Sequence, residues 1–279
     1  MSPAGSIRWV VALPAEAAPL IDYFSMSLVH AAPFKVYRSK DEVHWLVVCG
    51  IGKVAAAGAA AHLHAVSEAT KADAWMNLGI AGHQSAELGT VFLVHKATDR
   101  ATASTWYPLI LFKSKQTTCQ VETVDAPLTC YQPGYLYDME ASGYFATVTR
   151  FSTQELCHSI KVVSDNATAS IDGINRKRVI GWIEGSIPLV GEVVKALLDL
   201  SSQEHERLDP PYEMGVLLER WHFSVSQRHE LKKLVLRWKA LNSELNLLDS
   251  DLISARDGKI FLSALREHLA ALPPEQGEL

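Results

Sequence analysis

Over its first 200 residues the chain repeats one order of apolar and polar positions: a short apolar run, a turn with glycine or proline, and a stretch of helical spacing. The runs predict strands over 7–11 and 90–95, and further strands that end at residues 48, 79 and 165. Amphipathic helices are predicted over 139–151 and 183–202. This alternation is typical of an α/β fold with a mixed, largely parallel central sheet flanked by helices.

The pattern changes near residue 203. Residues 203–213, QEHERLDPPYE, are polar and contain two prolines, which predicts a linker. Two later runs have apolar residues at steps of three and four and predict a helical hairpin; they contain Leu231, Leu234, Trp238, Leu241, Leu245 and Leu248, and then Leu262, Leu265, Leu269 and Leu272. We therefore expect an α/β domain over residues 1–203 and a linker with an α-helical C-terminal extension over 204–279. Since two helices cannot bury both stripes alone, we expect them to pack on the main domain or on another subunit.

Composition and charge limit the classes of binding partner that we expect. The chain has 279 residues, of which 48% are hydrophobic and 20% charged, so it can bury a large core. A net charge of −5 without a long basic run argues against nucleic acid and anionic membranes and favours a small molecule. No apolar run approaches the roughly 18 residues of a membrane span, and the four cysteines have neither zinc-site nor disulfide-framework spacing. We expect a cytoplasmic protein.

Several candidate site residues follow predicted strands. Glu16, Gly50, Gly79 and Asp165 come after the carboxyl ends of strands. Ligands of open α/β sheets bind at these ends, because loops converge there and helix N-termini point inward. Glu140 lies instead at the start of the helix predicted over 139–151, where the helix dipole favours a carboxylate.

Five motifs stand in a fixed order along residues 7–202: ALPAEAAPL, GIGKVAAAGAA, NLGIAG, YDMEAS and VVSDNA. Together they resemble the nucleoside phosphorylase and 5′-methylthioadenosine/S-adenosylhomocysteine nucleosidase superfamily. The resemblance implies a purine nucleoside as substrate, no metal or organic cofactor, and a homo-oligomer, with a dimer favoured. Each acid alone is explained as a solvated residue at the end of an element, whereas their joint occurrence in matched motifs predicts one functional pocket.

The resemblance also implies a role for each matched position. Glu16 matches the acid that orients and activates the attacking water. Glu140 matches the acid that holds the ribose hydroxyls, with Met139 packed on the sugar. Asp165, helped by Ser164, matches the acid that protonates the purine at N7.

The remaining matched positions are less specific. Lys161 stands where nucleosidases carry an arginine near the water site, so the positive charge is kept and the forked geometry is lost. The other positions implied to contact substrate are Asp125, Ala126 and Pro127, in a loop that contacts the base, and Gly79 and Ile80 in the glycine motif.

The chemistry requires these residue types. Cleavage of a ribosyl N-glycosidic bond develops positive charge on the sugar and negative charge on the purine. Asp165 must therefore carry a proton that it can deliver to the base. Glu16 must be ionised to orient water, and Glu140 can accept charge-assisted hydrogen bonds from two hydroxyls.

The nucleophile depends on whether a phosphate site exists. A phosphorylase needs arginines and a hydroxyl that converge on phosphate. The N-terminal loop LPAEAAP has no arginine, and Asn77 and Ile80 stand where phosphorylases of the superfamily have an arginine and a serine. Water is therefore the expected nucleophile, so we predict a nucleosidase. A phosphorylase with a rebuilt phosphate site, using Arg100 or Lys53, is the alternative within the enzyme class.

A nucleoside-binding module without turnover is the alternative from another class. Ile80, Lys161 and a connection over 99–140 that is shorter than in the family motivate it. This connection leaves the choice of nucleoside open, with Trp106 and Tyr107 as candidate stacking or lining groups.

Overall fold

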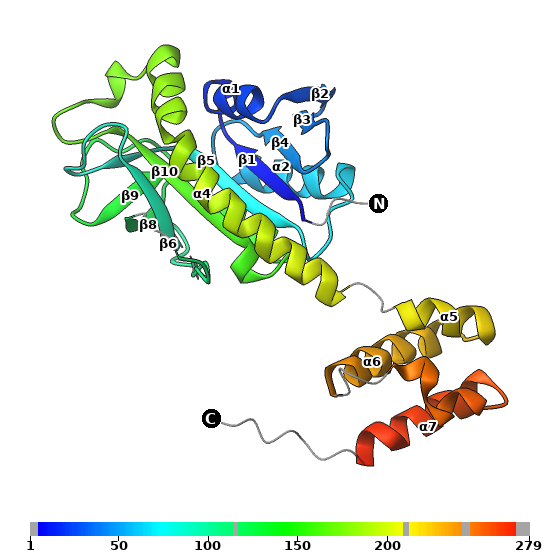
Figure 1. Ribbon diagram of the computed structural model, residues 1–279. Coiled ribbons are helices and arrows are strands. Elements are labelled where there is room, and N and C mark those ends of the chain that lie inside the picture. The colour runs from blue at the N-terminus through cyan, green and yellow to red at the C-terminus, as the bar shows by residue number, and fades with distance from the viewer. Residues whose placement is uncertain (1–4, 114–116, 209–211, 242–245, 272–279) are drawn as a thin grey trace. The chain divides into compact units, whose positions relative to one another are not determined.

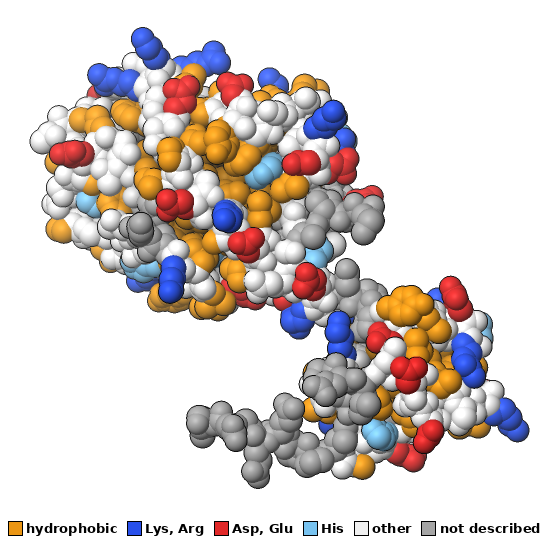
Figure 2. Space-filling view, in the orientation of Figure 1, with side chains coloured by type: hydrophobic (Ala, Val, Ile, Leu, Met, Phe, Trp, Pro, Cys, Tyr) orange, Lys and Arg blue, Asp and Glu red, His pale blue; other side chains and the backbone are white. Residues whose placement is uncertain are grey.

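The computed structural model describes residues 5–113, 117–208, 212–241 and 246–271. They form two compact units, Met1–Arg207 (unit 1) and Leu208–Leu279 (unit 2) (Figure 1). Figure 2 shows charged side chains distributed among apolar ones on the visible face of each unit. Within the described ranges, no helix has both the length and the apolar character needed to cross a membrane.

Unit 1 is built on a ten-stranded mixed sheet. Its described strands are β1 (Ile7–Val11), β2 (Met26–His30), β3 (Lys35–Ser39), β4 (His44–Val48), β5 (Ala74–His83), β6 (Val91–Asp99), β7 (Thr105–Trp106), β8 (Thr118–Thr123), β9 (Tyr135–Asp138) and β10 (Cys157–Asp165). The order is β10-β6-β8-β9-β5-β1-β4-β3-β2, with β7 on β6. Because β10 also pairs with β5, five strands close into a ring. The predicted mixed α/β class is confirmed.

The sheet divides at β5. One edge of β5 pairs with β10, from Trp75 to Gly82. The other edge pairs with β1 at residues 74–77 and with β9 at residues 82–83. Residues 78–81 therefore have no strand beside them on that edge of the described sheet. The strand predicted to end at residue 79 continues to His83, because β9 and β10 supply partners for its last residues.

Helices cover both faces of the sheet. The alternating side chains of β1 separate two cores, since Trp9 and Val11 point to one face and Val10 to the other. The first core contains residues of α1 (Pro14–Tyr23) and α4 (Arg176–Leu208), and the second contains residues of α2 (Lys53–Val66) and α3 (Ala141–Val148).

Small residues let α2 and α3 approach each other closely. The buried positions of α2 are Ala56, Ala59, Ala60 and Leu63. At Gly143 of α3, an added Cβ would lie only 1.9 Å from the carbonyl oxygen of Lys53. Only glycine fits at this crossing.

Helix α4 extends beyond its predicted end and takes up the start of the predicted linker, through Leu208. Its last turns are held by polar contacts with the residues just before β5. The hydroxyl of Ser201 donates to the carbonyl oxygen of Ala72 at 2.7 Å, and His205 Nε2 lies 3.7 Å from Asp73 Oδ1. These contacts stabilise helix where the polar sequence alone indicated a loop.

Unit 2 consists of α5 (Tyr212–Arg220), α6 (Val225–Leu241), two short 3₁₀ turns (Leu247–Asp249 and Asp251–Ser254) and α7 (Gly258–Ala271). It has a core of its own, which includes Leu217, Phe223, Leu231, Trp238, Phe261, Leu262, Leu265 and Leu269. The predicted hairpin thus has a third helix, α5, which supplies apolar side chains to the same core. Leu245 and Leu272 of the predicted stripes lie outside the described residues.

Candidate active site

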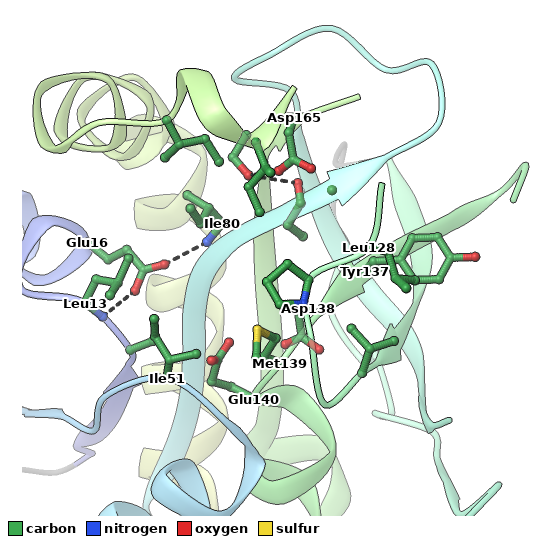
Figure 3. Close-up of a pocket in the computed structure, with 18 of the residues that line it drawn as sticks. Leu13, Glu16, Ile51, Ile80, Leu128, Tyr137, Asp138, Met139, Glu140 and Asp165 are labelled. Atoms are coloured by element: carbon green, nitrogen blue, oxygen red, sulfur yellow. Dashed lines mark hydrogen bonds between the residues drawn. The ribbon is translucent and has the colours of Figure 1, made fainter. Parts of the chain in front are cut away.

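A cavity of about 170 Å³ opens at the carboxyl ends of β1, β5 and β10, beside the unpaired edge of β5. Glu16, Glu140 and Asp165 reach it from three different elements (Figure 3). Much of the remaining wall is apolar and includes Ile51, Leu128, Ile171 and Ile174. None of the described residues that line the cavity is a lysine, an arginine or a histidine.

The side chain of Glu16 binds the edge of β5 at residues 78–81, where no described strand pairs with it. It lies in the first turn of α1, where its Oε2 accepts from the backbone N–H of Leu13 at 2.7 Å. Its Oε1 accepts from the backbone N–H of Ile80 at 2.9 Å and so takes the place of a strand partner on β5. Burial raises the pKa of Glu16, while these backbone hydrogen bonds and the charge of Lys161 oppose the rise.

Glu140 precedes α3 and bonds to a different helix. Its Oε1 accepts from the backbone N–H of Gly52, the residue before α2, at 2.8 Å. It stands at the N-cap position of α3 but forms no side-chain capping bond there. Burial, and then the neighbouring Asp138, raise the pKa of Glu140 to about 7 against the effect of Lys161.

Lys161 lies behind the cavity wall and is fully buried on β10. Its Nζ is 2.7 Å from Asp138 Oδ2. Asp138 in turn accepts from the hydroxyl of Thr123 at 2.7 Å and from the backbone N–H of Ala141 at 2.8 Å. Burial lowers the pKa of Lys161, but the charges of Asp138, Glu140 and Glu16 outweigh it, so the pKa is raised. The ammonium of Lys161 therefore contacts Asp138 and interacts through its charge with Glu140 and Glu16.

Gly79 leaves the space for this arrangement. A Cβ at this position would lie 3.1 Å from Glu16 Oε1 and 3.4 Å from Lys161 Nζ. Gly79 does not line the cavity, and it acts by letting the buried lysine approach the glutamate.

Asp165 ends β10 and is 4% exposed. The hydroxyl of Ser164 lies 2.5 Å from its Oδ1, and the hydroxyl of Tyr131 forms a hydrogen bond with its Oδ2. Both carboxyl oxygens therefore have a hydroxyl partner.

The other predicted residues divide into two groups. Met139, Ile80, Pro127 and Ser164 line the cavity. The remaining two, Asp125 and Ala126, are exposed and do not line it. Asp125 Oδ1 instead lies 2.9 Å from Lys53 Nζ. The loop that was expected to contact the base therefore reaches the cavity with Pro127, and beyond it with Leu128 and Tyr131.

The two cations considered for a phosphate site are used elsewhere. Lys53 pairs with Asp99 and Asp125, and Arg100 lies 3.8 Å from Glu122; neither cation lines the cavity. Asn77 is buried, and its side chain donates to the carbonyl oxygen of Val10 on β1 and accepts from the hydroxyl of Ser159 on β10.

Trp106 and Tyr107 lie away from this cavity. They line a separate hollow together with Phe145 and Cys157. Their expected role as lining groups of the nucleoside pocket is therefore wrong. Trp106 lies on β7, which pairs with β6, and the hollow is lined on its other side by Phe145 of α3.

Three polar residues of the described lining were not singled out from the sequence: Tyr131, Tyr137 and Asp138. The last of these stands two positions before Glu140 in YDMEAS, so it could have been found as a second acid of the same motif. Tyr131 lies in a loop without periodic pattern, and nothing local distinguishes it. Across the described part of the chain, no group of three or more His, Cys, Asp or Glu side chains is arranged to hold a metal ion.

Comparison with known proteins gives fold-level matches. No protein-family model matches the sequence, and no curated protein sequence matches it. A 5′-methylthioadenosine/S-adenosylhomocysteine nucleosidase from S. pneumoniae superposes with a TM-score of 0.55 at 18% identity, over 69% of this chain and 99% of that one. The 5′-methylthioadenosine nucleosidase of Arabidopsis thaliana gives 0.54 at 19% identity, over 69% and 96% of the two chains.

A further solved structure in this group is named for a different substrate. The futalosine hydrolase of Helicobacter pylori gives a TM-score of 0.54 at 11% identity, over 68% of this chain and 98% of that one. The resemblance inferred from the motifs is thus confirmed at the level of the fold: this chain carries the fold of these nucleosidases.

Proposed function

We propose that unit 1 hydrolyses the N-glycosidic bond of a purine nucleoside. One observation carries the proposal: three carboxyl groups from separate elements, Glu16, Glu140 and Asp165, meet in a cavity whose described lining contains no basic side chain. Hydrolysis of this bond needs an acid for the leaving base and a carboxylate for water. A third carboxylate is well suited to hold the ribose.

Glu16 is the proposed water-orienting base. Two backbone N–H groups fix its carboxylate, and each oxygen retains a further lone pair. Lys161 supports the ionised form from behind the wall. Lys161 is therefore proposed to assist electrostatically without touching substrate.

Glu140 and Met139 are the proposed ribose contacts. The Oε1 of Glu140 is bound by the N–H of Gly52, which fixes the orientation of the carboxylate. A ribose diol can donate two hydrogen bonds to such a fixed acceptor. Because the pKa of Glu140 is raised to about 7, we expect nucleoside affinity to increase as pH rises through neutrality.

Asp165 is the proposed general acid, with Ser164 as its hydrogen-bond partner. It lies apart from Glu16, on the other side of Ile80 (Figure 3). This separation suits an acid that faces the base while the water lies on the other side of the sugar. Pro127 and Ile80 are proposed to bound the nucleoside.

The charge of the wall favours water over phosphate as the nucleophile. Phosphate in this cavity would lie among Glu16, Asp138, Glu140 and Asp165, without an arginine or lysine at the wall to neutralise it. The same repulsion disfavours a 5′-phosphate, so the proposed substrate is a nucleoside rather than a nucleotide. The similar nucleosidases and the futalosine hydrolase support this substrate class.

Release of free base from a nucleoside panel tests the proposal. The panel contains adenosine, inosine, methylthioadenosine, adenosylhomocysteine and 5′-deoxyadenosine, each with and without phosphate. We expect release that does not depend on phosphate and that falls at least 100-fold in Asp165→Asn, with ligand affinity largely kept. Asp172→Asn, the same change at an exposed site, is the control.

Two other outcomes would replace the proposal. Release that requires phosphate would indicate a phosphorylase. Tight nucleoside binding without release of base by the wild type would indicate a binding module.

A further inference from the structure

Asp99 is a buried acid that joins the start of α2 to the start of α3. It ends β6, is 4% exposed and does not line the cavity. Its Oδ2 accepts from Lys53 Nζ at 3.0 Å and from the hydroxyl of Ser142 at 2.9 Å. Its Oδ1 accepts from the backbone N–H of Thr102 at 2.9 Å and from the hydroxyl of the same residue at 3.1 Å. Each carboxylate oxygen therefore has two donors.

These donors keep Asp99 ionised. Burial alone would raise its pKa, but the hydrogen bonds from Lys53, Ser142 and Thr102 outweigh burial and lower the pKa to about 2. An ionised carboxylate only accepts hydrogen bonds, whereas the NH₂ group of asparagine only donates them. Asparagine at this position would turn its NH₂ group toward one of the two pairs of donors, so it cannot replace the acid.

The two residues bound by Oδ2 stand next to the hydrogen bond that fixes Glu140. Lys53 directly follows Gly52, whose backbone N–H donates to Glu140 Oε1 at 2.8 Å. Ser142 stands two positions after Glu140, in the first turn of α3. One buried carboxylate thus links the helix that carries the donor of this bond to the helix that carries its acceptor.

Glu140 reaches across to α2 because other groups cap its own helix. The backbone N–H of Ala141 donates to Asp138 Oδ2 at 2.8 Å, and that of Ser142 donates to Thr123 Oγ1 at 2.9 Å. An N-cap side chain commonly accepts from N–H groups in the first turn, and that role is already taken here. The orientation of the Glu140 carboxylate therefore depends on how the starts of α2 and α3 are held together.

We propose that Asp99 is a positioning residue for ribose binding, because it holds the start of α2 against the start of α3 and so fixes the carboxylate of Glu140. This inference rests on the proposed function, in which Glu140 binds the ribose hydroxyls. Asp99 does not touch substrate and acts through Lys53 and Ser142. Without it, the carboxylate of Glu140 gains freedom of movement, and ribose binding must then remove that freedom.

Hydrogen exchange of the Gly52 amide tests the positioning in the full chain without substrate. NMR follows this single amide, and Glu140→Ala, which removes the acceptor, gives its exchange rate without the bond. In Asp99→Asn we expect exchange of the Gly52 amide to rise about 3- to 10-fold, which corresponds to the value of one hydrogen bond. The amide of Gly50, which donates to the carbonyl oxygen of Ala12 at 3.0 Å, should be unchanged.

Two further variants complete this test. Asp41→Asn is the matched control, because Asp41 also accepts from a serine hydroxyl and a backbone N–H but lies between β3 and β4. It should leave the Gly52 amide unchanged. Ser142→Ala removes only the bond between Asp99 and α3, so exchange should rise in the same direction by a smaller factor. This variant decides the question if Asp99→Asn does not fold.

Steady-state kinetics provide a readout that separates positioning from a general structural role. For the nucleoside that is cleaved fastest, Asp99→Asn should raise KM about 3- to 10-fold and change kcat less than about twofold, because the contact with the ribose is weakened equally before and during the reaction. KM for the matching 2′-deoxynucleoside should rise less, since that sugar lacks one of the two hydroxyls that Glu140 is proposed to bind.

Three results would overturn the proposal. They are an unchanged Gly52 amide in both Asp99→Asn and Ser142→Ala, an equal rise in KM for the two sugars, and a fall in kcat at constant KM. The exchange measurement needs no turnover. A wild type that cleaves no nucleoside would therefore contradict the proposed function, while the Gly52 amide would still show whether Asp99 positions Glu140.

Discussion

Glu140→Gln should make unit 1 more stable at alkaline pH, although it removes a proposed substrate contact. The side chain is buried, and its raised pKa means that ionisation is less favourable in the folded chain than in the unfolded chain. Glutamine has nearly the same shape and can still accept from the backbone N–H of Gly52. The substitution therefore removes the cost of the charge and keeps the hydrogen bond.

The size of this stability difference follows from the linkage between protonation and folding. The pKa of Glu140 is about 7 in the folded chain, against an ordinary value of 4.5. The folded state binds the proton more tightly, so stability is greatest below pH 4.5 and is lost as pH rises through 7. Between about pH 5 and about pH 8 the wild type should lose roughly 2 to 3 kcal/mol relative to Glu140→Gln.

Amide hydrogen exchange of β5 measures this difference in unit 1 alone, because β5 is its central strand. Exchange rates are corrected for their intrinsic pH dependence. Protection in Glu140→Gln should match the wild type near pH 5 and exceed it about 30- to 150-fold near pH 8, the free-energy difference expressed as an equilibrium. Glu184→Gln, an exposed position on α4, is the control and should show no such trend.

Two results would refute the reasoning. A difference that does not change with pH would mean that the charge of Glu140 carries no cost in the folded chain. A wild type that is more stable than Glu140→Gln near pH 8 would mean that Lys161 outweighs burial.

Two further predictions concern packing and charge. Gly143→Ala should destabilise unit 1 by about 1–3 kcal/mol in thermal unfolding, because its Cβ would overlap the carbonyl of Lys53, whereas Gly181→Ala, with open space around it, should be neutral or stabilising by up to about 1 kcal/mol. Equal effects of the two changes would contradict the close approach of α2 and α3. Lys161→Met should cost about 3–5 kcal/mol by leaving the buried Asp138 without its counter-charge, and a loss near zero would contradict the importance of this ion pair for stability.

Strong periodicity made the layers of unit 1 predictable. The apolar run over 7–11 gives a strand buried on both faces, and the small residues of 53–66 give a helix that packs closely on another. The same reasoning put Glu16 and Asp165 at the carboxyl ends of strands, and both line one cavity. Local pattern is sufficient here because these elements are central and bury most of their side chains.

Partly exposed elements were not predictable in this way. Strand β2 is exposed at four of its five residues, and β9 has only four residues, so neither gives a usable apolar period. Trp106 lies in the two-residue strand β7, and Asp125 and Tyr131 lie in the connection between β8 and β9. Their placement is set by pairing between distant segments, which one sequence does not reveal.

Ile80 supports the site through its backbone N–H, whatever its side chain. Its backbone N–H, on the edge of β5 between β1 and β9, is what binds Glu16. That N–H is present whatever the side chain, provided that the sheet divides at β5. An isoleucine at position 80 therefore supports Glu16 through its backbone and offers no hydroxyl to a phosphate. In the proposed nucleosidase, this residue is compatible with water as the nucleophile and unfavourable for phosphate.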